Sequence, residues 1–352
     1  MKVLHLLVSG KTGGVERLCV DIAKLSEDEN TFYFLYGGGK CADEIKEYSN
    51  TVVRYCSKLN IIKEILFFKT FIKSHNFNIV ILHFQAPLLM FFATMIPKTV
   101  PVVMYLHADP NELFKSNKTR FFYNLVEKRL KGFISISQFV ASNFSTDKTN
   151  KVIYNGTDFG KFSEKKIFRK ENIINLIYVG RLEKEKGLQH LLNTLHEIEY
   201  PFYFTIVGDG SYRAQLEAEV LSLNMQSCVK FCGECIDVKN YLKKCDLFIH
   251  PATINEGFGI SLIEAMSFYL PCLAYKRGAI PEIINDNVNG FLVNGFSSDS
   301  FKLRLNDVLK LYYKDFEQYV LICNNAKERS KCFTSEIFVS SLGEYLHDLC
   351  EE

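Results

Sequence analysis

A chain of 352 residues is too long for one ordinary hydrophobic core and suits two domains of roughly 150 residues each. Hydrophobic residues make up 47% of it and charged residues 23%, which argues against a disordered, collagen-like or solenoid protein. The net charge of +2 argues against a dedicated nucleic-acid binder, because such domains concentrate positive charge. Residues 1–160 carry 20 basic and 14 acidic side chains, so we expect the first half to face any anionic partner.

The eleven cysteines follow no regular spacing, and the N-terminal segment lacks the layout of a signal peptide. We therefore expect reduced thiols in the cytoplasm. Cys232 and Cys235 have the spacing of a metal or redox pair, but no second pair completes a zinc site, so we interpret them as ordinary core or turn residues. The longest apolar region, residues 79–97, is interrupted by polar residues and a proline, and no transmembrane helix is predicted.

Short apolar runs alternate with helix-compatible segments from the start of the chain. Buried strands are predicted at Val3–Val8, Thr31–Tyr36, Ile79–His83, Val102–His107 and Gly132–Ile136. A second series is predicted at Ile174–Tyr178, Phe202–Val207, Val229–Phe231, Leu247–His250 and Pro271–Ala274. Such alternation is typical of parallel sheets flanked by helices.

The two series predict two similar α/β domains. The predicted N-terminal domain covers residues 1–160, and a charged linker occupies 161–172. The predicted second domain covers 173–335, and a closing helix occupies 336–352. Neither domain has G-x-G-x-x-G after its first strand, so a nicotinamide or flavin site has little support.

The densest group of chemistry-bearing residues follows the strand predicted at Leu247–His250. It runs Glu256-Gly-Phe-Gly-Ile-Ser-Leu-Ile-Glu264, and a helix is predicted from Ile260. Free N–H groups and the positive end of a helix dipole make such a glycine-bearing junction a phosphate site. Two carboxylates would suit hydroxyl groups on either side of that phosphate. A helix-capping Glu256 with a solvated Glu264 explains the same pattern, so these residues alone leave both interpretations open.

Two cations stand just beyond the strand predicted at Ile174–Tyr178, at Arg181 and Lys186. Doubly wound sheets bind ligands at this end of their strands. Arg181 can hold phosphate oxygens bidentately and Lys186 can neutralise the remaining charge, which a departing nucleoside diphosphate requires. A solvated turn is the alternative, and we favour it for Lys184 and Glu185.

The first half offers fewer candidates. Gly13 and Gly14 precede a helix predicted to end near Leu25, and such a glycine turn can approach a ligand closely. His107 lies at the carboxyl end of its strand, where a histidine is more often structural than catalytic. Asp109 stands before a proline and is interpreted as a turn-capping residue.

Together these segments resemble a family 4 glycosyltransferase of the GT-B fold over nearly the whole chain, most closely from about Lys151 to Val293. The Glu256 to Glu264 segment is similar to the family's signature of two glutamates separated by seven residues. Tyr178-Val-Gly-Arg-Leu, followed by a lysine and glycine, and Ile206-Val-Gly-Asp-Gly precede it in the family's order.

The resemblance implies two Rossmann-like, doubly wound domains facing a central cleft. It also implies a retaining transferase that takes a sugar from a UDP- or GDP-sugar held mainly by the second domain. The residues that match its donor-binding positions are Arg181 and Lys186 on the diphosphate, Glu264 on the ribose, Glu256 on the transferred sugar, and the backbone amides of Phe258, Gly259 and Ile260.

Further positions are carried over in the same way. Gly14 would close against the phosphates and His107 would contact the sugar. Residues 278–282 would form a loop near the donor. His250 stands where the family is variable and is given no catalytic part, and Asp109 is not directly adjacent to the histidine as it often is in the family.

No Asp-x-Asp occurs in the sequence, so an acidic metal clamp is not indicated, and Arg181, Lys186 and the helix amides could replace a divalent ion. We expect metal-independent transfer without a cofactor. The resemblance favours same-face attack, with a donor phosphate accepting the acceptor's proton.

The acceptor is assigned to the first domain. A basic stretch there could rest on anionic lipid headgroups: Lys115, Lys118, Arg120, Lys128, Arg129 and Lys131 flank Phe121, Phe122 and Tyr123. Residues 61–72, with Lys63 and Lys69, add to it. An ordinary helix with one face on the sheet and solvated lysines explains the stretch equally well.

The sequence therefore predicts a cytoplasmic glycosyltransferase, peripheral on the inner membrane face, that extends a cell-surface glycan on a lipid-linked acceptor. A nucleotide-sugar epimerase or phosphorylase with a similar cleft is one alternative. An inactive nucleotide-sugar-binding protein is another. No nucleic-acid partner is expected.

Overall fold

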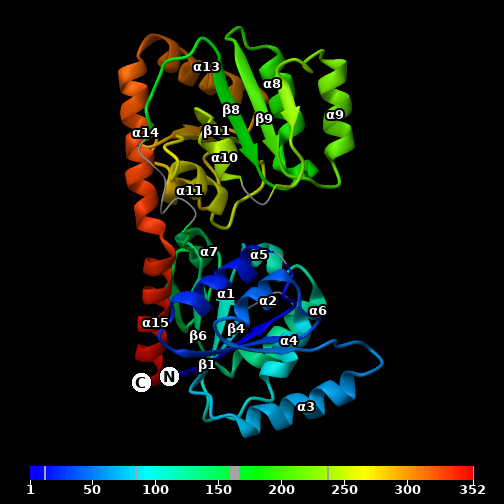
Figure 1. The fold of residues 1–352 in the computed structure, drawn as a ribbon. Coiled ribbons are helices and arrows are strands. Elements are labelled where there is room, and N and C mark those ends of the chain that lie inside the picture. The colour runs from blue at the N-terminus through cyan, green and yellow to red at the C-terminus, as the bar shows by residue number, and fades with distance from the viewer. Residues whose placement is uncertain (12, 84–85, 159–165, 236–237, 352) are drawn as a thin grey trace. The chain divides into compact units, whose positions relative to one another are not determined.

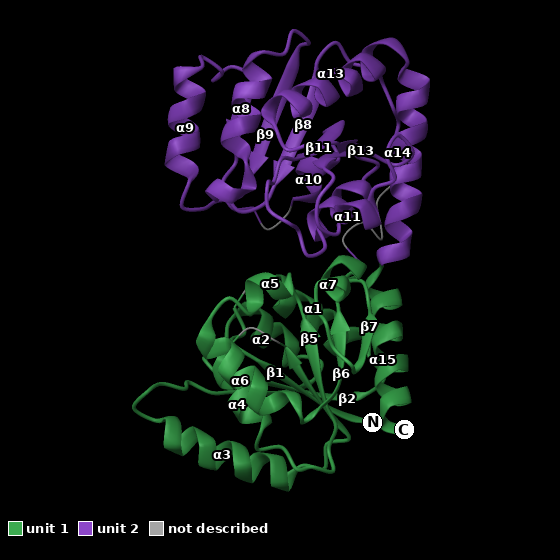
Figure 2. Cartoon of the chain, turned by 180° about the vertical axis from the view of Figure 1, so that it is seen from behind, with its two compact units in different colours: residues 1–156, 334–352 green, residues 157–333 purple. Residues whose placement is uncertain are grey.

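The computed structural model describes residues 1–11, 13–83, 86–158, 166–235 and 238–351. The chain divides into two compact units (Figure 1). Unit 1 comprises residues 1–156 and 334–352, and unit 2 comprises residues 157–333 (Figure 2). Each unit is built on one parallel sheet, which confirms the prediction of two doubly wound α/β domains.

The sheet of unit 1 has seven strands in the order β3-β2-β1-β4-β5-β6-β7. Their bounds are β1 Lys2–Leu7, β2 Glu29–Phe34, β3 Asn50–Val53, β4 Ile79–His83, β5 Val102–Leu106, β6 Leu130–Ser135 and β7 Thr149–Val152. The central strands are buried on both faces, as expected where helices cover both sides of a parallel sheet. The order reverses between β1 and β4, and a crevice for ligands opens at the carboxyl end of such a reversal.

The helices of unit 1 connect these strands, and the C-terminal helix joins them. Their bounds are α1 Gly14–Leu25, α2 Lys40–Ile45, α3 Ile61–Ser74, α4 Pro87–Ala93, α5 Pro110–Leu113, α6 Asn117–Glu127, α7 Gln138–Ser142 and α15 Ser335–Glu351. Helix α1 packs against α2 and α15, whereas α4 packs against α6. The buried Asp21 carboxylate accepts a 2.8 Å hydrogen bond from the Ser335 hydroxyl, which ties α1 to α15.

The sheet of unit 2 has six strands in the order β10-β9-β8-β11-β12-β13. Their bounds are β8 Ile174–Val179, β9 Phe202–Val207, β10 Val229–Phe231, β11 Leu247–His250, β12 Cys272–Tyr275 and β13 Phe291–Val293. The helices are α8 Leu188–His196, α9 Arg213–Ser222, α10 Lys239–Leu242, α11 Ile260–Met266, α12 Ile280–Ile283, α13 Ser298–Lys314 and α14 Phe316–Ser330, with short 3₁₀ turns at Lys184–Lys186 and Lys331–Phe333. The order reverses between β8 and β11.

The division of the chain falls a few residues from the expected boundaries. Residues 161–165 of the expected linker lie outside the described part, and Lys170 donates a 2.6 Å hydrogen bond to the Tyr313 carbonyl within unit 2. The helix expected at 336–352 is α15, and it belongs to unit 1, as Figure 2 shows by colour. Strands β3, β7 and β13 were not predicted.

None of the described helices combines the length and apolar character needed to cross a bilayer.

Candidate functional site

The loops after β8 and β11 meet at the switch point of the sheet of unit 2. Gly187 ends the first loop with a left-handed backbone, at a φ of 76°, and a Cβ there would clash with the Pro251 carbonyl oxygen of the second loop. Only glycine therefore allows this approach without strain. The contact places the functional residues of both loops at the edge where doubly wound sheets bind ligands.

Lys186 and Glu256 form an ion pair across the two loops, with side chains 13% and 17% exposed. His250 is the last residue of β11. Its Nε2 lies 3.3 Å from Glu256 Oε1, which is within ion-pair distance but does not meet hydrogen-bond geometry. Burial alone would raise the pKa of Glu256, but His250 and Lys186 outweigh it and lower that pKa to about 2. The carboxylate therefore stays ionised at neutral pH and is a weak base.

Arg181 stands on the same loop as Lys186 and is exposed. Its backbone is fixed, because its carbonyl oxygen accepts a 3.0 Å hydrogen bond from the Tyr178 hydroxyl. Its guanidinium makes no hydrogen bond or ion pair with another described residue. The charge is thus available for an anion, as expected for a phosphate-binding arginine.

Helix α11 begins at Ile260, four residues after Glu256 along the chain, and carries Glu264, which is partly buried. Gly259 precedes the helix with a φ of 107°, and Phe258 is buried against the Phe333 ring, with centroids 5.6 Å apart. The donor roles expected for the amides of residues 258–260 and for Glu264 stay predictions. Residues 258–260 follow Glu256 closely along this loop, and Glu264 lies about one turn into α11.

The loop at 278–280 supports Glu256 from behind. The Ala279 amide donates a 2.9 Å hydrogen bond to the Glu256 carbonyl oxygen. Gly278 has a φ of 54°, and a Cβ at that position would clash with the Glu256 backbone. This segment, which the resemblance places near the nucleotide-sugar donor, therefore contacts Glu256, a residue predicted to bind that donor.

Gly14 and His107 lie in unit 1. Gly14 begins α1 and is exposed, and a Cβ there would meet no described atom within 4 Å. His107 follows β5 and is partly buried, and its Nε2 lies 3.0 Å from His83 Nδ1. Burial lowers the pKa of His107 to about 3, so the ring is neutral at physiological pH. Their assigned contacts with the donor stay predictions.

Four other residues singled out in the sequence, Asp109, Cys232, Cys235 and His250, have defined surroundings. Asp109 caps α5 by accepting a 3.0 Å hydrogen bond from the Asn111 amide, as expected. Cys232 and Cys235 are free thiols. No cluster of three metal-ligating side chains occurs among the residues described, and metal independence stays a prediction. His250 was given no role by the sequence, although its place at the end of β11, beside the switch point, was a usable signal.

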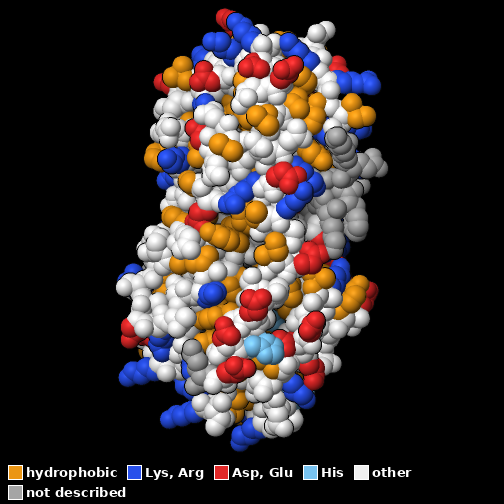
Figure 3. Space-filling model, turned by 90° about the vertical axis from the view of Figure 1, so that its left-hand side faces the viewer, with side chains coloured by type: hydrophobic (Ala, Val, Ile, Leu, Met, Phe, Trp, Pro, Cys, Tyr) orange, Lys and Arg blue, Asp and Glu red, His pale blue; other side chains and the backbone are white. Residues whose placement is uncertain are grey.

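The basic and aromatic stretch from Lys115 to Lys131, which contains α6, is partly structural. Arg129 Nη2 donates hydrogen bonds to the carbonyl oxygens of Ile96 and Pro97, at 3.0 and 2.9 Å. The Phe122 ring packs against Phe91, with centroids 6.2 Å apart. These two side chains are therefore not free for an outside partner. Figure 3 shows a different side of the chain, the one that carries α14 and α15, where basic, acidic and hydrophobic side chains are interspersed.

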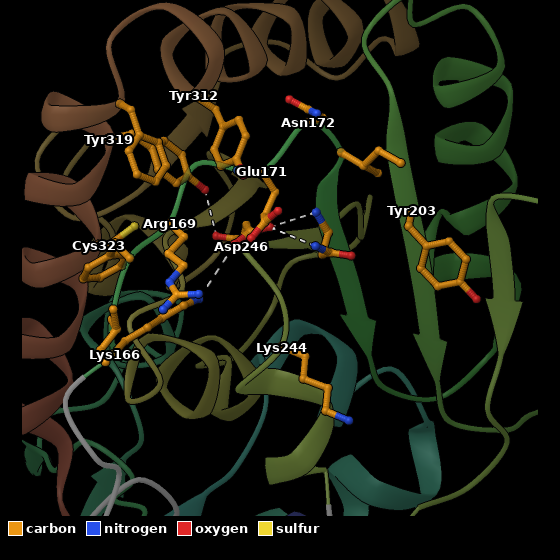
Figure 4. Close-up of a pocket in the computed structure, with 15 residues that line it drawn as sticks. Lys166, Arg169, Glu171, Asn172, Tyr203, Lys244, Asp246, Tyr312, Tyr319 and Cys323 are labelled. Carbon is orange, nitrogen blue, oxygen red and sulfur yellow. Dashed lines mark hydrogen bonds and ion pairs between the residues drawn. The ribbon is translucent and has the colours of Figure 1, made fainter.

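A pocket of about 710 Å³ lies at the amino ends of β8, β9 and β11, the edge opposite the loops described above (Figure 4). Asp246 at its centre accepts hydrogen bonds of 2.9 and 3.2 Å from the backbone and side-chain nitrogens of Asn175. The Tyr319 hydroxyl donates to the Asp246 carbonyl, and Lys166 donates to the Cys245 carbonyl. Because these polar groups satisfy one another, we interpret the pocket as a structural junction.

Both halves of the chain match known families. Residues 12–161 match the family model described as Glycosyltransferase Family 4, and residues 160–329 match the one described as Glycosyl transferases group 1. The two matches follow each other along the chain with the changeover near the boundary between the units.

Individual relatives agree with these matches. The chain is 26% identical over 360 residues to a Campylobacter jejuni enzyme named as a GalNAc-alpha-(1->4)-GalNAc-alpha-(1->3)-diNAcBac-PP-undecaprenol alpha-1,4-N-acetyl-D-galactosaminyltransferase, with 95% of this chain and 94% of that protein covered. It is 24% identical to an uncharacterized glycosyltransferase of Methanocaldococcus jannaschii, with 88% of each chain covered.

The fold is also found in solved structures. Anabaena HepE in complex with UDP-glucose superposes with a TM-score of 0.83 and 24% identity, over 99% of this chain and 100% of that chain. The lipopolysaccharide glycosyltransferase WaaG superposes with a TM-score of 0.72 and 16% identity, over 98% and 99%. These likenesses establish the GT-B fold.

We predict that Gly278→Ala displaces the Glu256 loop. An alanine there combines a strained φ with a backbone clash, so the free energy of unfolding should fall by at least about 1–3 kcal/mol. Thermal denaturation measures the loss. Gly343→Ala is the matched control, because its added Cβ meets nothing within 4 Å on α15; it should leave stability unchanged or raise it by about 0.5–1 kcal/mol. Equal melting of the two variants would contradict the prediction.

A second prediction concerns the fully buried His5 and His83 of unit 1. Burial lowers the pKa of His5 to about 4 and that of His83 well below its usual value, although the Asp28 charge opposes the shift at His5. The unfolded chain takes up protons below about pH 6.5 that the folded chain cannot accept. Stability is therefore complete above that pH and is lost as the pH falls toward 4.

Denaturant titrations should show unit 1 at least about 4 kcal/mol less stable at pH 5 than at pH 7, because His107, whose pKa burial also lowers, adds to His5 and His83. His190→Gln, at an exposed histidine on α8, should leave the difference unchanged. Identical unfolding midpoints at the two pH values would rule the effect out.

Proposed function

Because the chain belongs to the glycosyltransferases described by the family 4 and group 1 models, we propose that it transfers a sugar from a UDP- or GDP-sugar to a glycan acceptor, with retention of configuration and without a metal ion. The sugar is held mainly by unit 2. The observation that carries this proposal is the convergence of Lys186 and Glu256, with the unpaired Arg181 on the same loop, at the switch point of that unit.

The charges of this cluster suit a sugar diphosphate. Arg181 binds phosphate oxygens bidentately, and Lys186 adds a second positive charge to the leaving diphosphate. Glu256 would repel the diphosphate, so it takes the hydroxyl groups of the sugar, and its pairing with Lys186 holds it in place. The Glu264 carboxylate, eight residues further on, takes the ribose hydroxyls.

The low pKa of Glu256 bears on the mechanism. A carboxylate with a pKa of about 2 is ionised at neutral pH and is too weak a base to take the acceptor's proton, so we propose same-face attack in which Glu256 accepts no proton. In that reaction the acceptor hydroxyl attacks the anomeric carbon while the diphosphate leaves, and a donor phosphate oxygen takes the hydroxyl proton. A glycosyl-enzyme trapped on Glu256 would overturn this assignment.

The acceptor is proposed to be a lipid-linked glycan in cell-surface polysaccharide synthesis. The support is the Campylobacter relative, whose name gives an undecaprenol diphosphate-linked glycan as its substrate. Unit 1 is assigned to acceptor binding, and His107 and Gly14 to the donor sugar and its phosphates.

Helix α3 is the proposed contact with the cytoplasmic face of the membrane. One face of it is buried, with Phe68 fully inaccessible, yet Ile62 and Leu66 are 72% and 60% exposed. Lys63 and Lys69 are exposed on the same helix. Exposed apolar side chains beside lysines are the combination that binds anionic lipid surfaces. Figure 1 shows α3 at the outer margin of unit 1.

We predict that Arg181→Ala weakens binding of the nucleotide diphosphate at least about tenfold without loss of stability, because a charge-assisted contact is worth about 1.5–3 kcal/mol and Arg181 makes no hydrogen bond to a described side chain. Thermal stabilisation by UDP, GDP, UDP-glucose and GDP-mannose measures binding. Lys184→Ala, on the same loop, is the matched control and should bind as the parent does.

Unchanged binding by Arg181→Ala would remove the phosphate site from this loop. Incubation with each donor alone separates the alternatives. A change of the sugar without acceptor would indicate an epimerase, and tight binding without turnover across acceptors would indicate a binding protein.

A further prediction concerns the membrane. Ile62→Ser combined with Leu66→Ser should reduce sedimentation with phosphatidylglycerol vesicles at least about tenfold, since each residue loses roughly 1.5 kcal/mol or more of apolar burial. Binding should also fall with added NaCl. Leu303→Ser, at a residue 69% exposed on unit 2, is the control and should bind normally. Binding that is absent, or insensitive to salt, would refute the contact.

A further inference from the structure

Three histidines on three neighbouring strands of unit 1 form a hydrogen-bonded chain. His5 lies on β1, His83 ends β4, and His107 follows β5. His5 Nδ1 lies 3.0 Å from His83 Nε2, and His83 Nδ1 lies 3.0 Å from His107 Nε2. At the other end, His5 Nε2 lies 2.9 Å from the Asn30 side-chain oxygen, on β2. The chain thus crosses the sheet in the order of its strands.

The surroundings hold the rings in place. His5 and His83 are fully inaccessible, and Asn30 is 5% exposed. The His5 ring stacks on Phe32 with centroids 4.5 Å apart, and the His83 and His107 rings stack within 8° of parallel. Buried rings in such packing cannot turn to exchange partners, so the hydrogen-bonding direction has to be fixed by chemistry along the chain.

That direction begins at Asn30. Its amide nitrogen lies 2.9 Å from the Asp28 backbone carbonyl oxygen. A carbonyl oxygen can only accept, so the atom facing it has to be the NH₂ group, and the atom facing His5 has to be the side-chain oxygen. That oxygen also only accepts. His5 therefore carries a proton on Nε2.

The remaining protons follow in sequence. A neutral His5 with its proton on Nε2 presents a lone pair at Nδ1, so His83 Nε2 donates to it. His83 then presents a lone pair at Nδ1, to which His107 Nε2 donates. His107 is left with a bare lone pair on Nδ1. That atom is buried and has no hydrogen-bond partner among the residues described.

We infer that Asn30, His5 and His83 are positioning residues that lock His107 in the tautomer with its proton on Nε2, so that Nδ1 accepts a hydrogen bond from a hydroxyl group of the sugar substrate. The identity of the ligand rests on the proposed function; the tautomer does not. Asn30 and the Asp28 carbonyl cannot take up a proton, so the chain orients His107 and does not conduct protons.

The lone pair on His107 Nδ1 determines which groups this residue can bind. A lone pair on Nδ1 accepts from hydroxyl and amide N–H groups and is repelled by phosphate oxygens and ring oxygens. Burial lowers the pKa of all three histidines and keeps the chain neutral, which agrees with this polarity. His107 thus recognises the sugar and would be unsuited to the diphosphate.

Nitrogen-15 spectra of the histidine-labelled protein test the tautomer directly, because protonated and lone-pair ring nitrogens have widely separated shifts. At pH 7 we expect His107, assigned from the His107→Gln variant, to carry its proton on Nε2. Asn30→Ala removes the acceptor that sets the direction, so a second population with the proton on His107 Nδ1 should appear. Asn78→Ala, which removes an asparagine bonded to the Lys2 amide on the same sheet, is the control and should keep the parent pattern.

A proton on His107 Nδ1 in the unmutated protein would overturn the inference. So would an unchanged His107 tautomer in Asn30→Ala. If that variant does not fold, the spectrum of the unmutated protein still decides. Addition of UDP-glucose, UDP-N-acetylgalactosamine or GDP-mannose should shift His107 Nδ1, whereas UDP alone should not. Failure of every nucleotide sugar to bind would count against the proposed function alone. The spectra of the free protein test the histidine tautomer separately, because they need no donor.

Discussion

The largely buried ion pair between Lys186 and Glu256, with side chains 13% and 17% exposed, is the interaction on which the candidate donor site depends. It joins two loops whose residues are 70 positions apart, and it compensates a carboxylate that burial would otherwise neutralise. Removing one partner of such a pair leaves an uncompensated buried charge, at a cost of about 3–5 kcal/mol. Gly187 and Gly278 make the close backbone approaches that bring the pair together, so the electrostatics of the site rest on backbone geometry that only glycine supplies.

In both units the candidate residues gather near the point where the strand order reverses, but the side chains gathered there differ in charge. In each, the strand order reverses beside the first strand, and the candidate side chains lie on or directly after strands near that reversal. Unit 2 gathers charged groups there, which suits a diphosphate. Unit 1 gathers neutral histidines, whose direction of hydrogen bonding is set from Asn30. We propose that this difference divides anion binding in unit 2 from hydroxyl recognition in unit 1.

Much of the fold could be predicted from the sequence. The buried strands of both sheets, and the helix from Gly14 to Leu25, gave clear apolar patterns. Strands β3 and β7 were missed because they lie at the sheet edges and are only partly buried, and half or more of the side chains in each are polar. Strand β13 was also missed, and its length does not explain this, because the predicted strand β10 has three residues as well. The partnership of α15 with unit 1 depends on Asp21, 314 residues away, and local sequence does not report such contacts.

The sequence by itself determined the fold class and the order of the candidate groups, because apolar periodicity and residue chemistry are local properties. Arg181, Lys186 and Glu256 were proposed in this way, whereas the sugar contact of His107 came from the family resemblance, and all four assignments stay predictions. Only the tertiary structure decided which groups touch. His250 lies within ion-pair distance of Glu256. His5, His83 and His107 form one hydrogen-bonded chain, because strand pairing places residues tens of positions apart side by side. A hydrogen bond depends on that register within a few tenths of an ångström, and no spacing along the chain encodes it.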